Sequence, residues 1–265
     1  MIIGDRSVEP IGFGTAQLAF KDVTVEQAVA TVRAAVDSGI NVIDTALAYT
    51  RPGVESFAEA VVAEALAGRA GILVATKGGH RRAGDTFPVD ARPPSLRADC
   101  EVSLRTLGVD AIDLYQLHHV DSRVPLVDSV GALEELRIAG KIAMIGLSNV
   151  DIAQIEQACA VAPIVSVQNR LSFADRDDLA TADHCRRHGI AYLAYMPLHG
   201  SGDVAAVQVV ADRHGVSPQQ VRLAWLLAQG QHIMALVGSS RPITIADSAA
   251  AGGLRLDDDD LHRLG

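Results

Sequence analysis

Four polar side chains stand at the ends of apolar, strand-like runs, where proton-transfer chemistry can be assembled from separate strands. Asp44 follows NVI, Tyr49 comes five positions later, Lys77 follows ILVAT, and His118 follows IDLYQL. A carboxylate, a phenol, an ammonium and an imidazole brought together can deliver a proton to a carbonyl oxygen. The residue types therefore predict a carbonyl-reducing site, provided that the fold brings the strand ends together.

The elements that must position these residues alternate along the chain. Short runs rich in Val and Ile are separated by amphipathic stretches, a pattern typical of repeated strand and helix units around a parallel sheet. The expected strands are Ile11–Gly14, Asn41–Asp44, Ile72–Lys77, Ala111–Leu117, Ala143–Leu147, Ile164–Gln168, Ala191–Tyr195 and Met234–Val237. The expected helices begin near Val25, Glu55, Ser95, Pro125, Asp151, Asp175, Ser217 and Thr244.

Eight such units predict an α/β fold, a closed (β/α)8 TIM barrel. A β-hairpin formed by Met1–Ile3 and Ser7–Pro10 is expected to lie across the barrel bottom. The rival architecture is an open doubly wound sheet, whose Gly-x-Gly-x-x-Gly turn is matched here only in its first half, by Gly12 and Gly14. We therefore favour the barrel, as one domain over residues 1–265.

In such a barrel the C-terminal strand ends converge on one face, so Asp44, Lys77 and His118 should be neighbours. A free phenol titrates near about pH 10, and an adjacent Lys77 ammonium should lower the pKa of Tyr49. Asp44 would neutralise the buried ammonium, and His118 would orient the carbonyl oxygen. Taken singly, each residue also has a structural interpretation as a cap, surface charge, rim contact or core histidine, but their joint occurrence favours catalysis.

Three further histidines lie near the predicted site. His119 should face away from His118, because adjacent strand positions point to opposite sides, although the strand is ending there. His80 and His199 fall in expected loops, where they could line the pocket, and solvent exposure is the favoured interpretation for both.

Composition excludes several classes of protein. The net charge of −9 is spread along the chain apart from Asp257–Asp260, which we expect to open and cap a last helix. No basic footprint for nucleic acid is present, and no apolar run approaches the roughly 20 residues of a membrane span. The start of the chain lacks a signal-peptide pattern, so a cytoplasmic location is expected.

The three cysteines, Cys100, Cys159 and Cys185, fall in helical segments without metal-ligand spacing. This pattern predicts buried or half-buried free thiols, with no disulfide framework and no metal site. The only tryptophan, Trp225, has helical apolar spacing and is expected in the core.

Six segments of the chain resemble the aldo-keto reductase family: GFGTAQL (12–18), GINVIDTALAY (39–49), VATKGG (74–79), LGVDAIDLYQLHHVD (107–121), GKIAMIGLSN (140–149) and VSVQNRLS (165–172). The resemblance runs from about Pro10 to Ala250. It implies a (β/α)8 barrel that binds an extended nicotinamide cofactor without a Rossmann domain, and it implies the roles argued above for Asp44, Tyr49 and Lys77, together with that of His118.

The resemblance also implies cofactor contacts. Ser148, Asn149 and Gln168 match residues that hydrogen-bond the nicotinamide carboxamide, and Tyr195 matches the aromatic residue that stacks on the ring. Alternatively, Asn149 caps the following helix and Tyr195 belongs to the barrel core. The complete expected set is Gly14, Thr15, Asp44, Ser148, Asn149, Gln168, Tyr195, Pro197, Leu198, Gly238, Ser239, Ser240, Arg241, Thr244, Asp247 and Ser248.

The segment ALVGSSRPITIADS (235–248) resembles the family's adenosine-phosphate loop at a helix N-terminus. It departs from one common pattern, because Gly238 stands where many members have Lys and Thr244 where they have Arg. Arg241, with Ser239 and Ser240, is expected to contact a 2′-phosphate, so NADP is favoured over NAD.

The predicted activity is NADP(H)-dependent reduction of an aldehyde or ketone to an alcohol, with Tyr49 as proton donor. The alternatives are a cofactor-binding redox-sensing subunit on the same barrel and a Schiff-base lyase that uses Lys77. Loops at Ala16–Phe20, at Gly79–Phe87 and after Tyr195 should form an open substrate pocket. The sequence does not indicate which carbonyl compound is used or the oligomeric state.

Overall fold

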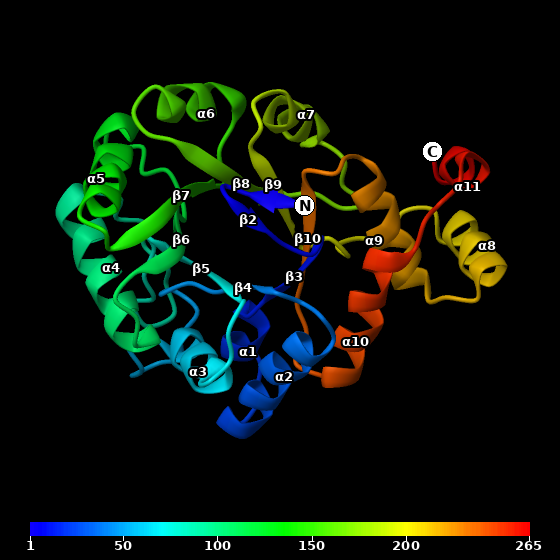
Figure 1. Ribbon diagram of the computed structural model, residues 1–265, viewed down its shortest axis with the longest axis horizontal. Helices are drawn as coiled ribbons and strands as arrows, with labels where there is room; N and C mark the ends of the chain where they lie inside the picture. Colours follow the sequence, from blue (N-terminus) through cyan, green and yellow to red (C-terminus); the bar gives the residue numbers. More distant parts are fainter.

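A closed barrel of parallel strands forms the centre of the computed structural model, which describes residues 1–265 (Figure 1). Its eight strands are hydrogen-bonded in the order β10-β3-β4-β5-β6-β7-β8-β9. They are β3 (Ile11–Gly14), β4 (Val42–Asp44), β5 (Leu73–Gly78), β6 (Ile112–Leu117), β7 (Ile142–Ser148), β8 (Ile164–Arg170), β9 (Ala191–Tyr195) and β10 (Ile233–Val237). The predicted (β/α)8 barrel is confirmed, and each predicted strand is found within two residues of its expected ends.

Helices surround the barrel (Figure 1). They are α1 (Ala16–Phe20), α2 (Val25–Asp37), α3 (Phe57–Leu66), α4 (Pro93–Leu107), α5 (Leu126–Ile138), α6 (Ile152–Cys159), α7 (Leu179–Arg187), α8 (Val204–His214), α9 (Pro218–Ala228), α10 (Pro242–Ala250) and α11 (Asp258–Leu264), with a 3-10 turn η1 (Ala251–Gly253). Two helices differ from expectation. The segment Ala16–Phe20 forms α1 rather than a loop, and α8 was not predicted.

Capping side chains fix several helix starts. The Thr24 hydroxyl accepts a hydrogen bond from the backbone N–H of Gln27, and the Gln27 side-chain oxygen accepts one from the backbone N–H of Thr24, so the expected N-cap of α2 is present. Asp257 and Asp260 form the same reciprocal arrangement at the start of α11, as predicted for the acidic segment. Both helices begin where a side chain satisfies an otherwise free backbone N–H.

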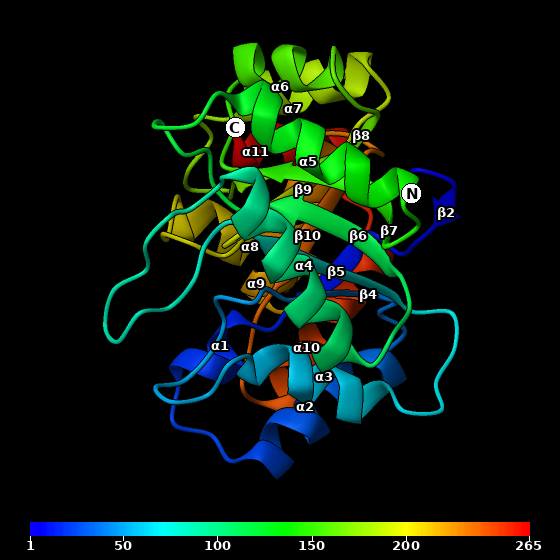
Figure 2. The ribbon, with the colours of Figure 1, turned by 90° about the vertical axis from the view of Figure 1, so that its left-hand side faces the viewer.

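A short hairpin closes the barrel bottom. Strands β1 (Ile2–Ile3) and β2 (Arg6–Ser7) pair antiparallel, and Ile3 is fully buried against the N-terminal parts of the barrel strands. The turn needs glycine, because Gly4 has φ 58° and a Cβ there would lie 2.5 Å from Met144 Sδ. Figure 2 shows this hairpin on one side of the barrel and the long loop between β5 and α4 on the other. The predicted hairpin is therefore confirmed.

Most of the remaining structural expectations are confirmed, and one is wrong. Trp225 is 3% exposed and belongs to the core, and Cys100 and Cys185 are buried. Cys159 is exposed, so the expectation that all three thiols would be buried or half-buried is wrong for this one, which lies in the last turn of α6. Each helix is too short or too polar to span a bilayer.

Candidate active site

The parallel register brings the predicted catalytic side chains to one face of the barrel. Asp44 ends β4 and pairs with Ala75, and Lys77 lies near the end of β5 opposite Gln116 of β6. His118 follows the last residue of β6, and its backbone N–H donates to Gly78 O at 3.0 Å. The convergence expected from a parallel barrel is thus present, since neighbouring strands end at the same edge.

Lys77 is the centre of the cluster. Its side chain has no exposed surface, and Nζ donates to Asp44 Oδ2 at 2.7 Å, to the backbone oxygen of Thr45 at 2.9 Å and to Tyr49 Oη at 3.4 Å. Burial lowers the pKa of Lys77, but the negative charge of Asp44 and the Tyr49 hydroxyl raise it by more, so the net shift is upward. The side chain is therefore a buried ammonium whose three donors are all occupied.

The pKa of Tyr49 shifts in the direction opposite to the one predicted. Removal of the phenol from water raises the pKa, and the neighbouring Lys77 ammonium lowers it by less, so the net shift is upward. The predicted shift followed from the ammonium alone, whereas desolvation of the buried ring penalises the phenolate more. Tyr49 therefore carries its proton at neutral pH, the form in which it can donate.

His118 presents a neutral imidazole to the cavity. Burial, followed by the Lys77 charge, holds the pKa of His118 well below its usual range. Its ring meets that of Tyr49 edge to face, with centroids 5.6 Å apart. Nδ1 is sealed from solvent without a partner, whereas Nε2 is not sealed and borders the cavity. An Nε2–H tautomer can donate a hydrogen bond to an oxygen bound beside Tyr49.

These side chains border a cavity of about 470 Å³ at the C-terminal face. Nine of the expected catalytic and cofactor residues line it besides Tyr49 and His118: Gly14, Asp44, Ser148, Asn149, Gln168, Tyr195, Pro197, Leu198 and Gly238. Ala16, Gln17 and Met196 also line it, in two of the segments expected to form the substrate pocket, whereas three lining residues were not assigned from the sequence: His119, Leu236 and Val237. The last two end β10, a position that in a parallel barrel always borders the cavity.

The expectation for His119 is wrong. Its ring stacks on that of His118 with centroids 5.1 Å apart, and it lines the same cavity. Strand β6 ends at Leu117, so the alternation of side-chain direction does not extend to these two residues. His199 is exposed as predicted and borders the cavity, whereas His80 is half-buried against both His118 and His119 and not freely exposed.

Amide and hydroxyl groups form one wall of the cavity. Gln168 Nε2 donates to Asp44 Oδ1 at 2.8 Å, and Ser148 Oγ donates to Gln168 O at 2.9 Å. Asn149 has φ 58°, accepts from Tyr195 Oη at 2.8 Å and donates to His118 O at 3.0 Å. Asn tolerates this left-handed conformation, which turns the chain from β7 toward α6. The structure brings these four predicted cofactor residues together.

Gln116 is a member of the site that the sequence analysis did not identify. It is fully buried in β6, and its Nε2 donates to Asp44 Oδ1 at 3.2 Å while its Oε1 has no partner. A signal existed, because Gln116 stands within an expected barrel strand, where an amide is unusual among apolar residues.

The expected adenosine-phosphate segment begins at the cavity, which Leu236, Val237 and Gly238 line, and continues beyond it to α10. Ser239 is buried and accepts from the backbone N–H of Arg241 at 3.0 Å, whereas the side chain of Arg241 is exposed. Pro242 begins α10, and the backbone N–H of Thr244 donates to Arg241 O at 3.1 Å, so it is not one of the free donors of the first turn. Ser240, which stands between Ser239 and Arg241 in the chain, is half-buried.

Three residues expected to contact the cofactor are buried or hydrogen-bonded within the protein. Thr15 is buried beneath the cavity, where its hydroxyl donates to Asp44 O at 3.1 Å. Asp247 accepts from Ser217 Oγ at 2.8 Å and Gln220 Nε2 at 2.7 Å, and so connects α10 to α9. Ser248 is 2% exposed. Their assignment to the cofactor stays a prediction.

Comparisons with known proteins agree with this architecture. A family model described as the Aldo/keto reductase family matches residues 10–265. Pyridoxine 4-dehydrogenase of Escherichia coli is 34% identical over 277 residues, which cover 99% of this chain and 96% of that protein. A glycerol dehydrogenase from Gluconobacter oxydans has TM-score 0.85 at 28% identity, covering 97% of this chain and 90% of that one. An aldo/keto reductase from Klebsiella pneumoniae in complex with NADP and acetate has TM-score 0.83 at 28% identity, with the same coverage.

Proposed function

The chain belongs to the aldo/keto reductase family, and we propose that its cavity binds NADP(H) and reduces an aldehyde or ketone to the alcohol with Tyr49 as proton donor. As a member of the family it is an NAD(P)H-dependent oxidoreductase. The observation that carries the proposed mechanism is the position of the Lys77 ammonium, fixed by Asp44 at 2.7 Å and lying 3.4 Å from Tyr49 Oη.

The residues present fit a nicotinamide cofactor. A carboxamide needs both donors and acceptors, which Ser148, Asn149 and Gln168 supply along one wall, and a flat ring suits the aromatic face of Tyr195. The exposed guanidinium of Arg241 beside the start of α10 suits a phosphate, because it can donate two parallel hydrogen bonds. When bound, the reduced nicotinamide supplies the hydride that a carbonyl carbon receives.

The protein's own residues move and stabilise the proton. Tyr49 holds its proton until negative charge develops on a neighbouring oxygen, and the Lys77 ammonium stabilises the phenolate that remains after donation. His118 Nε2 donates a hydrogen bond to the same oxygen and fixes its position beside Tyr49 Oη. Asp44 keeps the ammonium in place throughout, because its Oδ2 is the strongest partner of Lys77.

The Schiff-base alternative is disfavoured by the same geometry. Nζ of Lys77 is sealed and charged, with all three donors directed at Asp44, Thr45 and Tyr49. A Schiff base requires a neutral amine that a carbonyl carbon can reach. No feature of the cavity favours the redox-sensing alternative over turnover.

Tyr49→Phe tests the proposal. The variant should bind NADPH with nearly unchanged affinity, while turnover falls by a factor on the order of 10² or more, the usual contribution of a positioned general acid. Tyr115→Phe is a matched control, because the Tyr115 hydroxyl is buried in β6 without a hydrogen-bond partner and does not border the cavity. Unchanged turnover in Tyr49→Phe, with normal cofactor binding, would refute the assigned role.

The cavity rim guides the choice of substrate. The ring of Phe20 packs edge to face on those of Tyr49 and Phe87, with centroids 5.9 and 5.7 Å apart, and Met196, which lines the cavity, is half exposed. An apolar rim around a polar floor suits aldehydes or ketones with an apolar or aromatic body. Oxidation of pyridoxine and of glycerol with NADP should be assayed first, since similar proteins are named for these substrates.

A further inference from the structure

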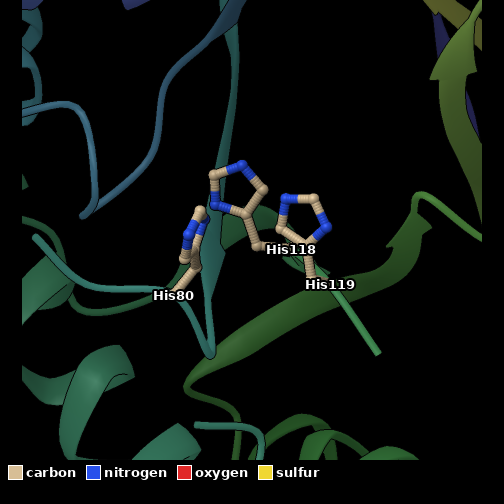
Figure 3. A group of neighbouring side chains, drawn as sticks. All are labelled: His80, His118 and His119. Atoms are coloured by element: carbon tan, nitrogen blue, oxygen red, sulfur yellow. The ribbon is translucent and has the colours of Figure 1, made fainter. Parts of the chain in front are cut away.

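Three imidazoles gather at the edge of the cavity, in a group that the proposed hydride transfer does not explain. His80 comes from the loop after β5, and His118 and His119 follow β6. One ring nitrogen of each lies within 4.8 Å of the corresponding nitrogens of the other two, and no other three His, Cys, Asp or Glu side chains are so arranged. Figure 3 shows His118 between the two other rings, with nitrogens of all three near one another.

The hydrogen bonds of His80 define its tautomer. Its Nε2 lies 2.7 Å from the backbone oxygen of Phe87, and a carbonyl oxygen can only accept, so Nε2 carries the hydrogen. Nδ1 therefore has a free lone pair, and it is sealed from solvent without a partner. Metal-bound histidines usually have this arrangement, in which the ring nitrogen that does not bind the metal donates to a backbone carbonyl or a carboxylate.

His118 offers a second unpartnered nitrogen. Its side chain is more than nine-tenths buried, and Nδ1 has no hydrogen-bond partner. With the hydrogen on Nε2, which borders the cavity, Nδ1 also carries a free lone pair. Leaving a buried polar atom unpaired costs about 1–3 kcal/mol, so two such atoms in neighbouring rings call for a shared partner.

His119 completes the set. Its Nε2 lies 3.5 Å from Asn149 Nδ2, at the limit of a hydrogen bond, and its ring stacks on that of His118. Burial lowers the pKa of all three rings, for His119 to about 4, so each is in the neutral form that metals bind. Neutral imidazoles without a thiolate or carboxylate suit Zn²⁺, Cu²⁺, Ni²⁺ or Co²⁺ rather than Mg²⁺ or Ca²⁺.

We propose that His80, His118 and His119 form a binding site for one divalent transition-metal ion. Ligand nitrogens around a tetrahedral ion lie roughly 3.3 Å apart, for bond lengths of about 2.0–2.1 Å. The three ring nitrogens lie within 4.8 Å of one another, so each of these distances has to shorten by about 1.5 Å at most. His118 belongs both to this metal site and to the proposed reductase site. Metal binding at its Nδ1 would therefore keep the hydrogen on Nε2, the nitrogen proposed to hold the substrate oxygen.

Cobalt binding to the metal-free full-length protein is the test. One equivalent of Co²⁺ should produce the intense visible absorption of a tetrahedral site, and Zn²⁺ should displace it. His80→Gln and His119→Gln should each raise the apparent Kd for Co²⁺ at least tenfold. His199→Gln, on the cavity wall outside the cluster, and His188→Gln, in a separate stacked pair with His184, should bind as the parent does.

Two results would overturn the site. The first is the absence of a tetrahedral cobalt spectrum, the outcome expected if a water molecule bridges the unpartnered nitrogens. The second is a spectrum that persists in His80→Gln or disappears in His188→Gln, which would locate the ion elsewhere. The binding measurement does not involve turnover, so the site and the proposed reductase activity can fail independently. Circular dichroism of each variant establishes that it is folded.

Discussion

The buried ion pair of Asp44 and Lys77 allows a test that needs no substrate. In Lys77→Met, Asp44 Oδ2 loses its only hydrogen-bond donor, while Oδ1 keeps the amides of Gln168 at 2.8 Å and Gln116 at 3.2 Å. In Asp44→Asn, the Lys77 ammonium keeps only the Thr45 carbonyl and the Tyr49 hydroxyl, with no compensating charge. Each single variant thus leaves one charge buried without its counter-ion.

The size of the effect follows from burial. The side chains of Lys77 and Asp44 are 0% and 5% exposed, so solvent does not screen the remaining charge. Removing one partner of such a pair destabilises a protein by about 3–5 kcal/mol, because the other charge stays buried. The double variant Asp44→Asn/Lys77→Met contains neither charge, so it should be less destabilised than the sum of the single variants by about 2 kcal/mol or more.

Urea unfolding of the four proteins measures this coupling. The control is the same cycle at Arg69 and Asp37, a pair 2.6 Å apart with side chains 32% and 63% exposed. Coupling in that exposed pair should stay below about 1 kcal/mol, since water screens it and side-chain entropy opposes it. Additivity within about 0.5 kcal/mol at Asp44 and Lys77 would show that the pair is not held as described.

Two further predictions concern cofactor preference and pH. Arg241→Ala should weaken NADPH binding more than NADH binding, as measured by nicotinamide fluorescence. The control variant Arg255→Ala, at the barrel bottom, should change neither affinity. If Arg241→Ala keeps the parent's preference for NADPH, Arg241 does not bind the phosphate. Glu59 is fully buried, and burial raises its pKa although Ser56 and Thr76 donate to it, so its stabilising contribution is lost as the pH rises through the folded-state pKa. As the pH rises from the usual range of a glutamate toward the raised folded-state pKa, unfolding measurements should therefore show Glu59→Gln gaining stability relative to the parent. A difference independent of pH would contradict this.

The barrel could be predicted because its strands are apolar on both faces and its helices are not. Runs such as Ile233–Val237 are too short for a helix and too apolar for an exposed strand, which leaves a buried parallel strand. Helix α8 was missed although Asp203 caps it and Gly215 ends it in a left-handed conformation. A regular alternation of one helix per strand left no place for an additional helix before α9.

The convergence of the proposed catalytic side chains could be predicted because their positions depend on strand ends, which sequence patterns locate well. What depends on burial could not be predicted in the same way. The pKa of Tyr49 rises because desolvation outweighs the effect of Lys77, a balance that depends on how much protein surrounds the phenol. The position of His80 depends on the path of the loop after β5, which no periodic pattern determines.

Gln168 explains how the two sides of the cavity act as one site. Strands β4, β5 and β6 supply the proton-transfer groups, while β7, β8 and β9 supply the expected carboxamide ligands. Gln168 belongs to the second set, yet its Nε2 donates to Asp44 Oδ1, on the carboxylate that holds Lys77. A glutamine amide has two N–H donors and one carbonyl, so one N–H can stay on Asp44 while the rest of the amide binds a carboxamide. On the proposed roles, cofactor binding therefore orders the same side chain that orients the ion pair beneath Tyr49, and this coupling depends on a contact between residues 124 positions apart in the chain.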